Sequence, residues 1–512
     1  MVPHDETYAR SELVADVRHL AEQLETAHPD PYDGHGGRVD FHRCVEEAVR
    51  AIPDAGEPLH EFYPRVAELV AGVRDGHTDI SPPDDSAIDG ELPLGLRVVG
   101  DELYVDEVYA DAHAELLGGR VVSAEGVPAD ELFERMRWLE GSDNVYQDRV
   151  SLALALRDVT PLRFLVGHPV HEPTFRIETT DGSTEERVVA PTARDDLVVT
   201  LERTVEPPET NGEPAFRLLD DGSTALLVLP DMFSYREAAE ILRSIGHEQA
   251  VEVARSTHDR VVDAAAPDDI EAVVADLPSA VEILTDLVTE MKSAGTDHLV
   301  IDTRANTGGN SLLSNLLTYV LYGWEGIATG GEDHIRVPKD SPLYRDCIDD
   351  EDRIGETDNP AGFDFESYFE TDRQQQVDRL RDWLSGSETV AAEFEAGTHE
   401  AYYEPECVTV VTAAMTYSAG AEPAFTLSKL GASVVGVPPS QAPNVPRDTL
   451  TDELPNTGLR FRTAYRHVES RPDVDGRVFP LTTELTAAQF ESMGRPADAG
   501  IRLAVAEESG SD

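Results

Sequence analysis

The sequence predicts an α/β protein with a parallel sheet, preceded by a helical region and by a region of mainly β structure. Between residues 10 and 74, apolar residues recur at three- and four-residue steps, as on the buried face of a helix. From 92 to 205, short alternating stretches are broken by glycine turns, which is typical of antiparallel strands. Beyond residue 220, continuous apolar strands alternate with helical patterns, which indicates a parallel sheet covered by helices on both faces.

The helical region has three segments. Leu13 to Leu24 gives the first, Phe41 to Ile52 the second and Phe62 to Val73 the third, which ends at Asp75-Gly76. We expect residues 1–90 to form a helical subdomain.

The β region contains two clear turn signals. "GGRVVSAEGVPADELFERM" (118–136) reads as a strand, a tight turn and a helix, and "PTFRIETTDGSTEERVVAP" (173–191) reads as a hairpin with Asp-Gly at its turn. We expect residues 91–215 to form a mainly β subdomain.

The α/β region is expected to span residues 216–490. Its buried strands are predicted within "STALLVLPDM", "HLVIDTR", "CVTVVTAA" and "SVVGV", each followed by a turn and mostly by a helix. Acidic helical insertions are expected near 234–277 and 338–400, and an acidic C-terminal tail over 491–512.

The net charge is extreme. Among the 512 residues, 100 Asp and Glu stand against 41 Lys and Arg, giving −59, and the only lysines are Lys292, Lys339 and Lys429. Dispersed acid with so little lysine suits a salt-rich cytoplasm, where screening weakens self-repulsion; the alternative is an acidic protein from ordinary salt. Such a surface repels nucleic acid. The N-terminus is polar and no apolar run reaches membrane-spanning length, so we expect a cytoplasmic protein with no nucleic-acid or membrane partner.

The three cysteines, Cys44, Cys347 and Cys407, are isolated from one another. They form no CxxC pair, so neither a disulfide framework nor a zinc site is supported. We expect no metal and no organic cofactor.

Two loops of the α/β region carry chemically suggestive residues. Gly308-Gly309 in "DTRANTGGN" follows a predicted strand and precedes a helix, so backbone N–H groups there can stabilise an oxyanion. The alternatives are a phosphate-binding loop and a plain linker. The sequence has neither the GxxxxGK[ST] nor the GxGxxG spacing of phosphate-binding loops. Ser418 in "TYSAGAEPAF" stands at the next strand-to-helix corner, where it is either a nucleophile or a helix N-cap. The N–H of Ala419 is the second candidate oxyanion donor.

A third suggestive segment is "RDGHTDI", in which His77 follows a glycine turn. A lone loop histidine is commonly just a solvated side chain. Spacing alone does not connect His77 with Ser418.

Together, "HPDPY…VRDGHTDI", "LVIDTRANTGG" and "TYSAGAEPAF…LGASVVGV" resemble the tail-specific (C-terminal processing) serine protease family, with the tricorn-core branch as the nearer likeness. The resemblance covers roughly residues 10–485. It implies a crotonase-like α/β core, an N-terminal helical subdomain and a degenerate PDZ-like β subdomain. Relatives often assemble, so a homo-oligomer is an implied partner.

The family uses its serine in two ways, and the lysines distinguish them. One branch of the family is known for a Ser–Lys dyad, with the lysine about two dozen residues after the serine. Here the only lysine that follows Ser418 is Lys429, which lies within the next helix. The other branch is known for a triad of serine, histidine and an acid. The resemblance to this branch implies that His77 is the general base. The acid that the resemblance implies lies in "HVESRPDVDGRVFPL": Asp473 matches best, with Glu469 and Asp475 as rivals, and an ordinary surface carboxylate is the alternative for each.

These residues predict a serine peptidase that cuts peptides or unfolded protein tails through an acyl-enzyme on Ser418. Two other classes stay open. One is a non-catalytic crotonase-like protein that binds a ligand or partner, and the other is an esterase, thioesterase or acyl-CoA hydratase on the same fold.

Overall fold

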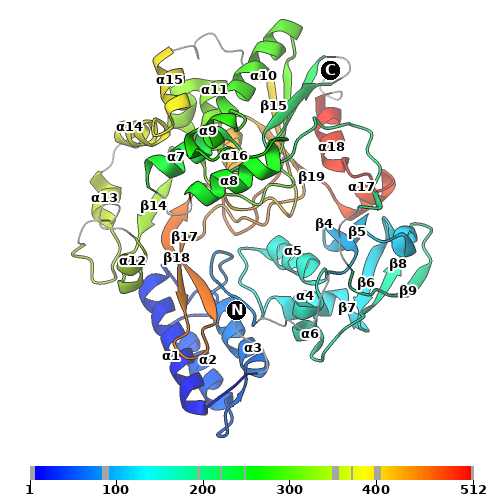
Figure 1. Ribbon diagram of the computed structural model, residues 1–512, viewed down its shortest axis with the longest axis vertical. Coiled ribbons are helices and arrows are strands. Elements are labelled where there is room, and N and C mark those ends of the chain that lie inside the picture. Colours follow the sequence, from blue (N-terminus) through cyan, green and yellow to red (C-terminus); the bar gives the residue numbers. More distant parts are fainter. Residues whose placement is uncertain are drawn as a thin grey trace. The chain divides into compact units, whose positions relative to one another are not determined.

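The computed structural model describes residues 6–83, 91–192, 197–219, 222–246, 250–348, 354, 357–370, 373–396 and 405–508 (Figure 1). They form two compact units. The first comprises Met1–Leu201, His334–Glu370 and Ala442–Val478, and the second comprises Glu202–Asp333, Thr371–Gln441 and Phe479–Asp512.

The first unit begins with the three helices that the sequence predicts: α1 (Arg10–Ala27), α2 (Arg38–Ala51) and α3 (Leu59–Ala71). Their apolar faces form one core, which includes the fully buried side chains of Leu13, Leu20, Phe41 and Phe62. Two short strands, β1 (Thr7–Tyr8) and β2 (Glu57–Pro58), pair beside them.

An antiparallel sheet of seven strands follows in the first unit. Its members are β4 (Leu94–Val99), β5 (Glu102–Val108), β6 (Arg120–Ala124), β7 (Val127–Pro128), β8 (Thr174–Glu178), β9 (Thr184–Val188) and β10 (Val199–Thr200). The predicted hairpin is confirmed, since β8 and β9 pair around Asp181-Gly182 with Gly182 at φ 81°. The 3₁₀ helix η1 (Asp111–Leu116) and helix α4 (Ala129–Met136) complete this part.

Two further helices, α5 (Val145–Ala155) and α6 (Val159–Val166), were not predicted in this mainly β stretch. Each begins at a capping residue: the Asn144 side chain accepts the N–H groups of Tyr146 and Gln147, and that of Asp158 accepts the N–H of Thr160. The capping residues were therefore the available sequence signal.

The first unit also contains a sheet built from distant segments: β3 (Asp79–Ile80), β14 (Ile335–Pro338), β17 (Arg447–Glu453) and β18 (Arg460–Glu469). Strand β18 pairs with both β3 and β14. Residues 334–370, with α12 (Pro342–Cys347) and α13 (Phe365–Glu370), and residues 442–478 therefore fold with the N-terminal helices. The sequence had placed them in the 216–490 core, because pairing between distant strands leaves no local pattern.

The second unit is organised around a six-stranded sheet in the order β11 (Ala215–Leu218), β12 (Thr224–Val228), β13 (His298–Asp302), β15 (Cys407–Thr412), β16 (Ser433–Gly436) and β19 (Thr483–Glu484). All neighbours are parallel except β11 and β12. The helices are α7 (Arg236–Ser244), α8 (Ala250–Val261), α9 (Ile270–Asp276), α10 (Ala280–Ala294), α11 (Leu312–Gly330), α14 (Arg373–Leu384), α15 (Glu388–Ala396), α16 (Glu422–Lys429), α17 (Ala487–Ser492) and α18 (Ala499–Glu508). In the described part of the chain, no helix is both long and apolar enough to cross a membrane.

Both faces of this sheet are apolar, which explains the continuous hydrophobic strands in the sequence. Leu226, Val300, Val411 and Val435 share one face and pack against α18. Their neighbours along the strands, Leu227, Ile301, Val410 and Val434, are buried on the other face. The predicted α/β sheet covered on two sides is confirmed.

Helix α18 corrects the expected acidic tail over 491–512. Ile501 and Ala504 are buried in the core of the sheet, three positions apart on one helix face. The high acid content of the segment concealed this short apolar face. Residues 509–512 lie outside the described part of the chain.

We expect Ile501→Ala to lower the free energy of unfolding by about 2–5 kcal/mol, because it removes a fully buried aliphatic side chain from the sheet core. Ile245→Ala is the matched control, since Ile245 is 51% exposed in the same unit. Chemical denaturation of both variants tests this. Equal losses would contradict the assignment of α18 to the core.

Candidate active site

Two loops of the second unit rise from the same edge of the sheet. Strands β13 and β15 are parallel neighbours, with Asp302 opposite Val411, so the loops that follow them start side by side. The first loop carries Gly308 and Gly309 and the second carries Ser418 and Ala419. The predicted placement of both segments after adjacent parallel strands is therefore confirmed.

Asn306 connects these loops. Its backbone carbonyl accepts the N–H of Tyr417 at 3.0 Å, and its side-chain amide donates to the carbonyl of Leu229 after β12 at 2.9 Å. Its Oδ1 accepts the N–H of Gly308 at 2.9 Å. The side chain is fully buried, so it fixes the ends of three strands relative to one another.

Gly308 lies directly against the candidate nucleophile. A Cβ at this position would stand 2.7 Å from Ser418 Cβ and 2.9 Å from the Tyr417 carbonyl oxygen, and the residue has φ 106°. Both the contact and the backbone conformation require glycine here.

Ser418 has φ 51°, a left-handed conformation that costs a non-glycine residue on the order of 1–3 kcal/mol. Its N–H donates to Oε1 of Gln441 at 2.9 Å, and Gln441 is fully buried. Ser418 opens the 3₁₀ helix η3 (Ser418–Ala421), while the N-cap position of η3 is Tyr417 and that of α16 is Ala421. The alternative that Ser418 is a helix N-cap is therefore wrong.

The two glycines offer different backbone groups. The N–H of Gly308 already donates to Asn306, which makes this residue a poor oxyanion donor. Gly309 has φ 138°, and a Cβ at this position would stand 2.7 Å from the ring of Phe233. The assignment of Gly309 and Ala419 as oxyanion donors stays a prediction.

Lys429 is placed away from any role as a base. It belongs to the last turn of α16, and its ammonium group donates to the carbonyl of Glu332 at 2.7 Å. This agrees with the sequence argument against a Ser–Lys dyad.

His77 belongs to the first unit, in the loop between α3 and β3. Its N–H donates to Oδ1 of Asp75 at 3.0 Å, and its ring Nδ1 lies 3.8 Å from the same oxygen. The imidazole is mostly buried, with 12% of the side chain exposed. Thus the loop itself places a carboxylate beside the predicted base.

Asp75 is a buried anion with several donors. Its Oδ2 accepts from Thr78 Oγ1 at 2.6 Å and from His28 Nε2 at 3.1 Å. Burial raises the pKa of Asp75, but hydrogen bonds from His28 and His77 outweigh burial and hold the pKa well below its usual range. His28 Nδ1 accepts the N–H of Asp30, so Nε2 carries the proton that it donates to Asp75.

A second acid, Asp143, approaches His77 from the loop before α5. Its two oxygens accept the N–H groups of Gly76 at 2.8 Å and Ala442 at 3.2 Å. Burial raises the pKa of Asp143 to about 6, and the nearby charge of His77 works in the opposite direction. Asp143 is therefore a weaker counter-charge than Asp75 at mildly acidic pH.

The acids that the resemblance implies are engaged by close neighbours in sequence. Asp473 forms an ion pair with Arg471 at 2.7 Å, and Glu469 lies 2.9 Å from His467 Nε2. Asp475 is exposed. Their role as the third member of a triad stays a prediction.

Asp75, His77 and Asp143 each offer one atom within 4.8 Å of the others, which is a spacing that could hold a metal ion. The carboxylate oxygens already accept the N–H and O–H groups described above. These hydrogen bonds explain why the two carboxylates lie close to His77: they hold the loop that carries it.

Sequence reasoning missed Asn306, Gln441, Asp75, Asp143 and His28. Asn306, Asp75 and His28 lie inside the quoted motifs. Gln441 and Asp143 act across long sequence separations, so no local spacing pointed to them.

We expect Gly308→Ala to slow acylation of Ser418 about a hundredfold, because the added Cβ displaces the serine from its position. Gly431→Ala is the control: Gly431 also has positive φ (98°), but nothing lies within 4 Å of its Cβ position. Labelling rates with a fluorophosphonate compare the two. An equal effect of both variants would show that the contact with Ser418 is unimportant.

Comparison with known proteins supports the fold. No protein-family model and no curated protein sequence matches the chain. Among solved structures, mature CPAF matches with a TM-score of 0.56 at 13% identity, covering 98% of this chain and 99% of that one. Mature CPAF complexed with lactacystin gives 0.57 at 14% identity over the same shares. The photosystem II D1 C-terminal processing protease matches at a TM-score of 0.39 and 11% identity, over 93% of each chain. The chain thus has the fold of CPAF.

Proposed function

We propose that the protein is a serine peptidase that hydrolyses peptides or protein tails through an acyl-enzyme on Ser418. The observation that carries the proposal is the left-handed backbone of Ser418, which stands directly against Gly308 at the edge of a parallel sheet. Unfavourable backbone conformations of this kind cluster at catalytic sites. The fold shared with CPAF supports the same class of activity.

In this mechanism, His77 takes the proton of the Ser418 hydroxyl as the serine attacks the peptide carbonyl, and then gives it to the leaving amine. The N–H groups of Gly309 and Ala419 stabilise the oxyanion. Water then hydrolyses the acyl-enzyme by the same route. Because Ser418 and His77 belong to different units, the mechanism requires the imidazole to reach the hydroxyl.

Asp75 is the acid that we assign to His77. It stays ionised because of its hydrogen bonds, so it stabilises the imidazolium that forms on proton transfer. Asp473 and Glu469 are the competing assignments, and each requires its carboxylate to exchange its present partner for His77.

The finer features of the resemblance belong to the same proposal. These are a crotonase-like core in the second unit, a PDZ-like origin of the β4–β10 sheet, and the tail-specific, tricorn-like type of protease. We also propose the salt-rich cytoplasm that a charge of −59 favours, so assays belong in concentrated KCl.

We expect a fluorophosphonate probe to label Ser418, with no label in Ser418→Ala and a rate reduced about a thousandfold or more in His77→Ala. Peptide hydrolysis should fall in parallel. His168→Ala is the matched control, since His168 is exposed in the same unit. Lys429→Ala should also keep full activity.

Other outcomes identify the alternative functions. No labelling of the native protein in concentrated KCl favours a non-catalytic binding protein. Labelling together with ester or thioester turnover, but without peptide turnover, favours an esterase or thioesterase.

Isosteric variants test which acid is the partner of His77. We expect Asp75→Asn to reduce kcat about a thousandfold, because it removes the counter-charge of the imidazolium, whereas Asp473→Asn and Glu469→Gln stay within about twofold. Steady-state kinetics on one peptide measures all three. A large loss in Asp473→Asn or Glu469→Gln, with activity retained in Asp75→Asn, would transfer the role to that residue.

A further inference from the structure

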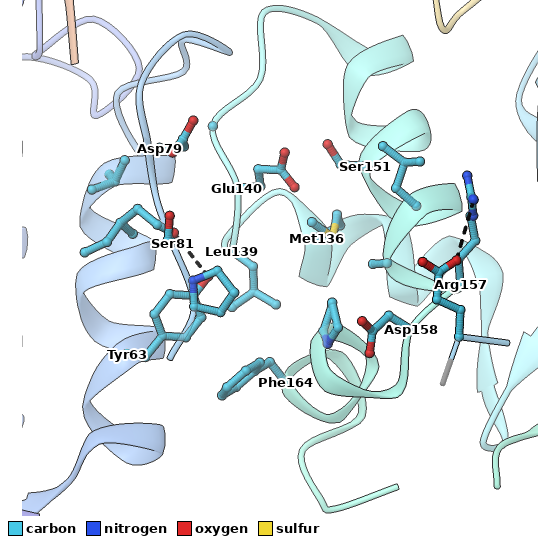
Figure 2. A pocket seen from close by; sticks show the side chains of 18 residues that line it. Tyr63, Asp79, Ser81, Met136, Leu139, Glu140, Ser151, Arg157, Asp158 and Phe164 are labelled. Carbon is cyan, nitrogen blue, oxygen red and sulfur yellow. Dashed lines mark hydrogen bonds and ion pairs between the residues drawn. The ribbon is translucent and has the colours of Figure 1, made fainter. Parts of the chain in front are cut away.

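The first unit contains a pocket of about 470 Å³ that the proposed peptidase mechanism does not use (Figure 2). Its walls come from α3 and β3 on one side and from α4, α5 and α6 on the other. The volume lies in the range of pockets that bind small organic molecules.

Most of the wall is apolar. Tyr63, Met136, Leu139 and Phe164 lie around the space in Figure 2, and the rings of Tyr63 and Phe164 are 5.0 Å apart at 56°. Leu154 also lines the pocket and is 44% exposed. An apolar ligand would cover these surfaces.

Four acids and one arginine also line the pocket, and three of the acids have partners. Asp79 accepts from Arg462 at 2.8 Å, and Glu91 lies 3.8 Å from Arg157. Asp158 caps α6 through the N–H of Thr160 at 2.7 Å.

Glu140 is the fourth acid, and its carboxylate projects into the space in Figure 2. In the described part of the chain, it has no arginine, lysine or histidine within ion-pair distance, and its hydrogen-bond partner is the Ser151 hydroxyl.

The surrounding protein raises the pKa of Glu140, chiefly through desolvation, although the residue remains exposed to solvent. Asp79 on β3 and Asp148 on α5 act in the same direction, while Arg462 on β18 and the Ser151 hydrogen bond oppose it. The carboxylate thus lacks a counter-charge that a ligand could supply.

We propose that this pocket binds an apolar primary amine, with its ammonium group against Glu140 and its hydrocarbon or aromatic body against the Tyr63–Phe164 side. The ammonium provides the missing counter-charge and the aromatic rings add cation–π or stacking contacts. A divalent metal fits poorly, because one unpaired carboxylate in apolar walls offers too few oxygen ligands. The inference rests on the first unit alone and does not depend on the proposed peptidase function.

A series of three indoles of similar shape tests the charge requirement. We expect tryptamine, which carries an ammonium, to bind at least about tenfold more tightly than neutral tryptophol, and indole-3-propionate, an anion, not to bind. Calorimetry on the full chain in concentrated KCl measures all three, since salt suppresses general attraction of cations to an acidic surface.

Glu140→Gln should abolish the preference for tryptamine over tryptophol. Glu134→Gln is the matched control and should keep it, because Glu134 is an exposed acid on α4 paired with Arg137. Equal binding of tryptamine and tryptophol to the native chain, or an unchanged preference in Glu140→Gln, would overturn the proposal.

A pH series on the native chain gives a second test that needs no variant. Tryptamine stays protonated between about pH 6 and about pH 8, whereas a carboxyl whose pKa is raised becomes more ionised as the pH increases. The affinity for tryptamine should therefore rise over this interval, while the affinity for tryptophol stays constant. A tryptamine affinity that does not change with pH would overturn the assignment of Glu140.

Discussion

The geometry of the second unit depends on the contact between Gly308 and Ser418. Two parallel strands bring their following loops to the same edge, but parallel pairing alone leaves the loops free to separate. The glycine allows the backbone of one loop to touch the serine of the other, and Asn306 fixes this approach with bonds to three strand ends. The left-handed conformation of Ser418 persists because these bonds and that of Gln441 over-determine it.

In the first unit, hydrogen bonds keep the buried carboxylate of Asp75 charged. Asp75 receives a hydroxyl, an imidazole N–H and a backbone N–H, and these donors replace the water that burial removed. The same hydrogen bonds shape the loop that carries His77. The proposed serine and histidine, more than 300 positions apart in sequence, are thus each held by a local hydrogen-bond network within their own unit.

Sequence patterns predicted the parts of the fold that local physics determines. Strand β13 and strand β15 were visible because both of their faces are buried, and α1 to α3 because each has one apolar stripe. Helix α18 was missed because its buried face is short and lies in an acidic segment. The partners of β18 were missed because β3 and β14 are far away in the chain. Ser418 and Gly308 stood out as motifs, whereas Asp75 did not, because nothing in the sequence marks which of the 100 acidic residues are buried.

The acids of the chain fall into two physical classes, exposed and buried. Acids in contact with water contribute to the charge of −59, and each is worth little individually. Asp75 and Asp143 differ because both are buried, so desolvation opposes their ionisation, and each responds differently. Asp75 has enough donors to remain an anion, whereas burial raises the pKa of Asp143 to about 6. Hydrogen-bond donors therefore help to decide whether a buried carboxyl stays ionised. Glu140 is exposed and has no ion-pair partner among the described residues, so a ligand's positive charge is a partner that it can gain.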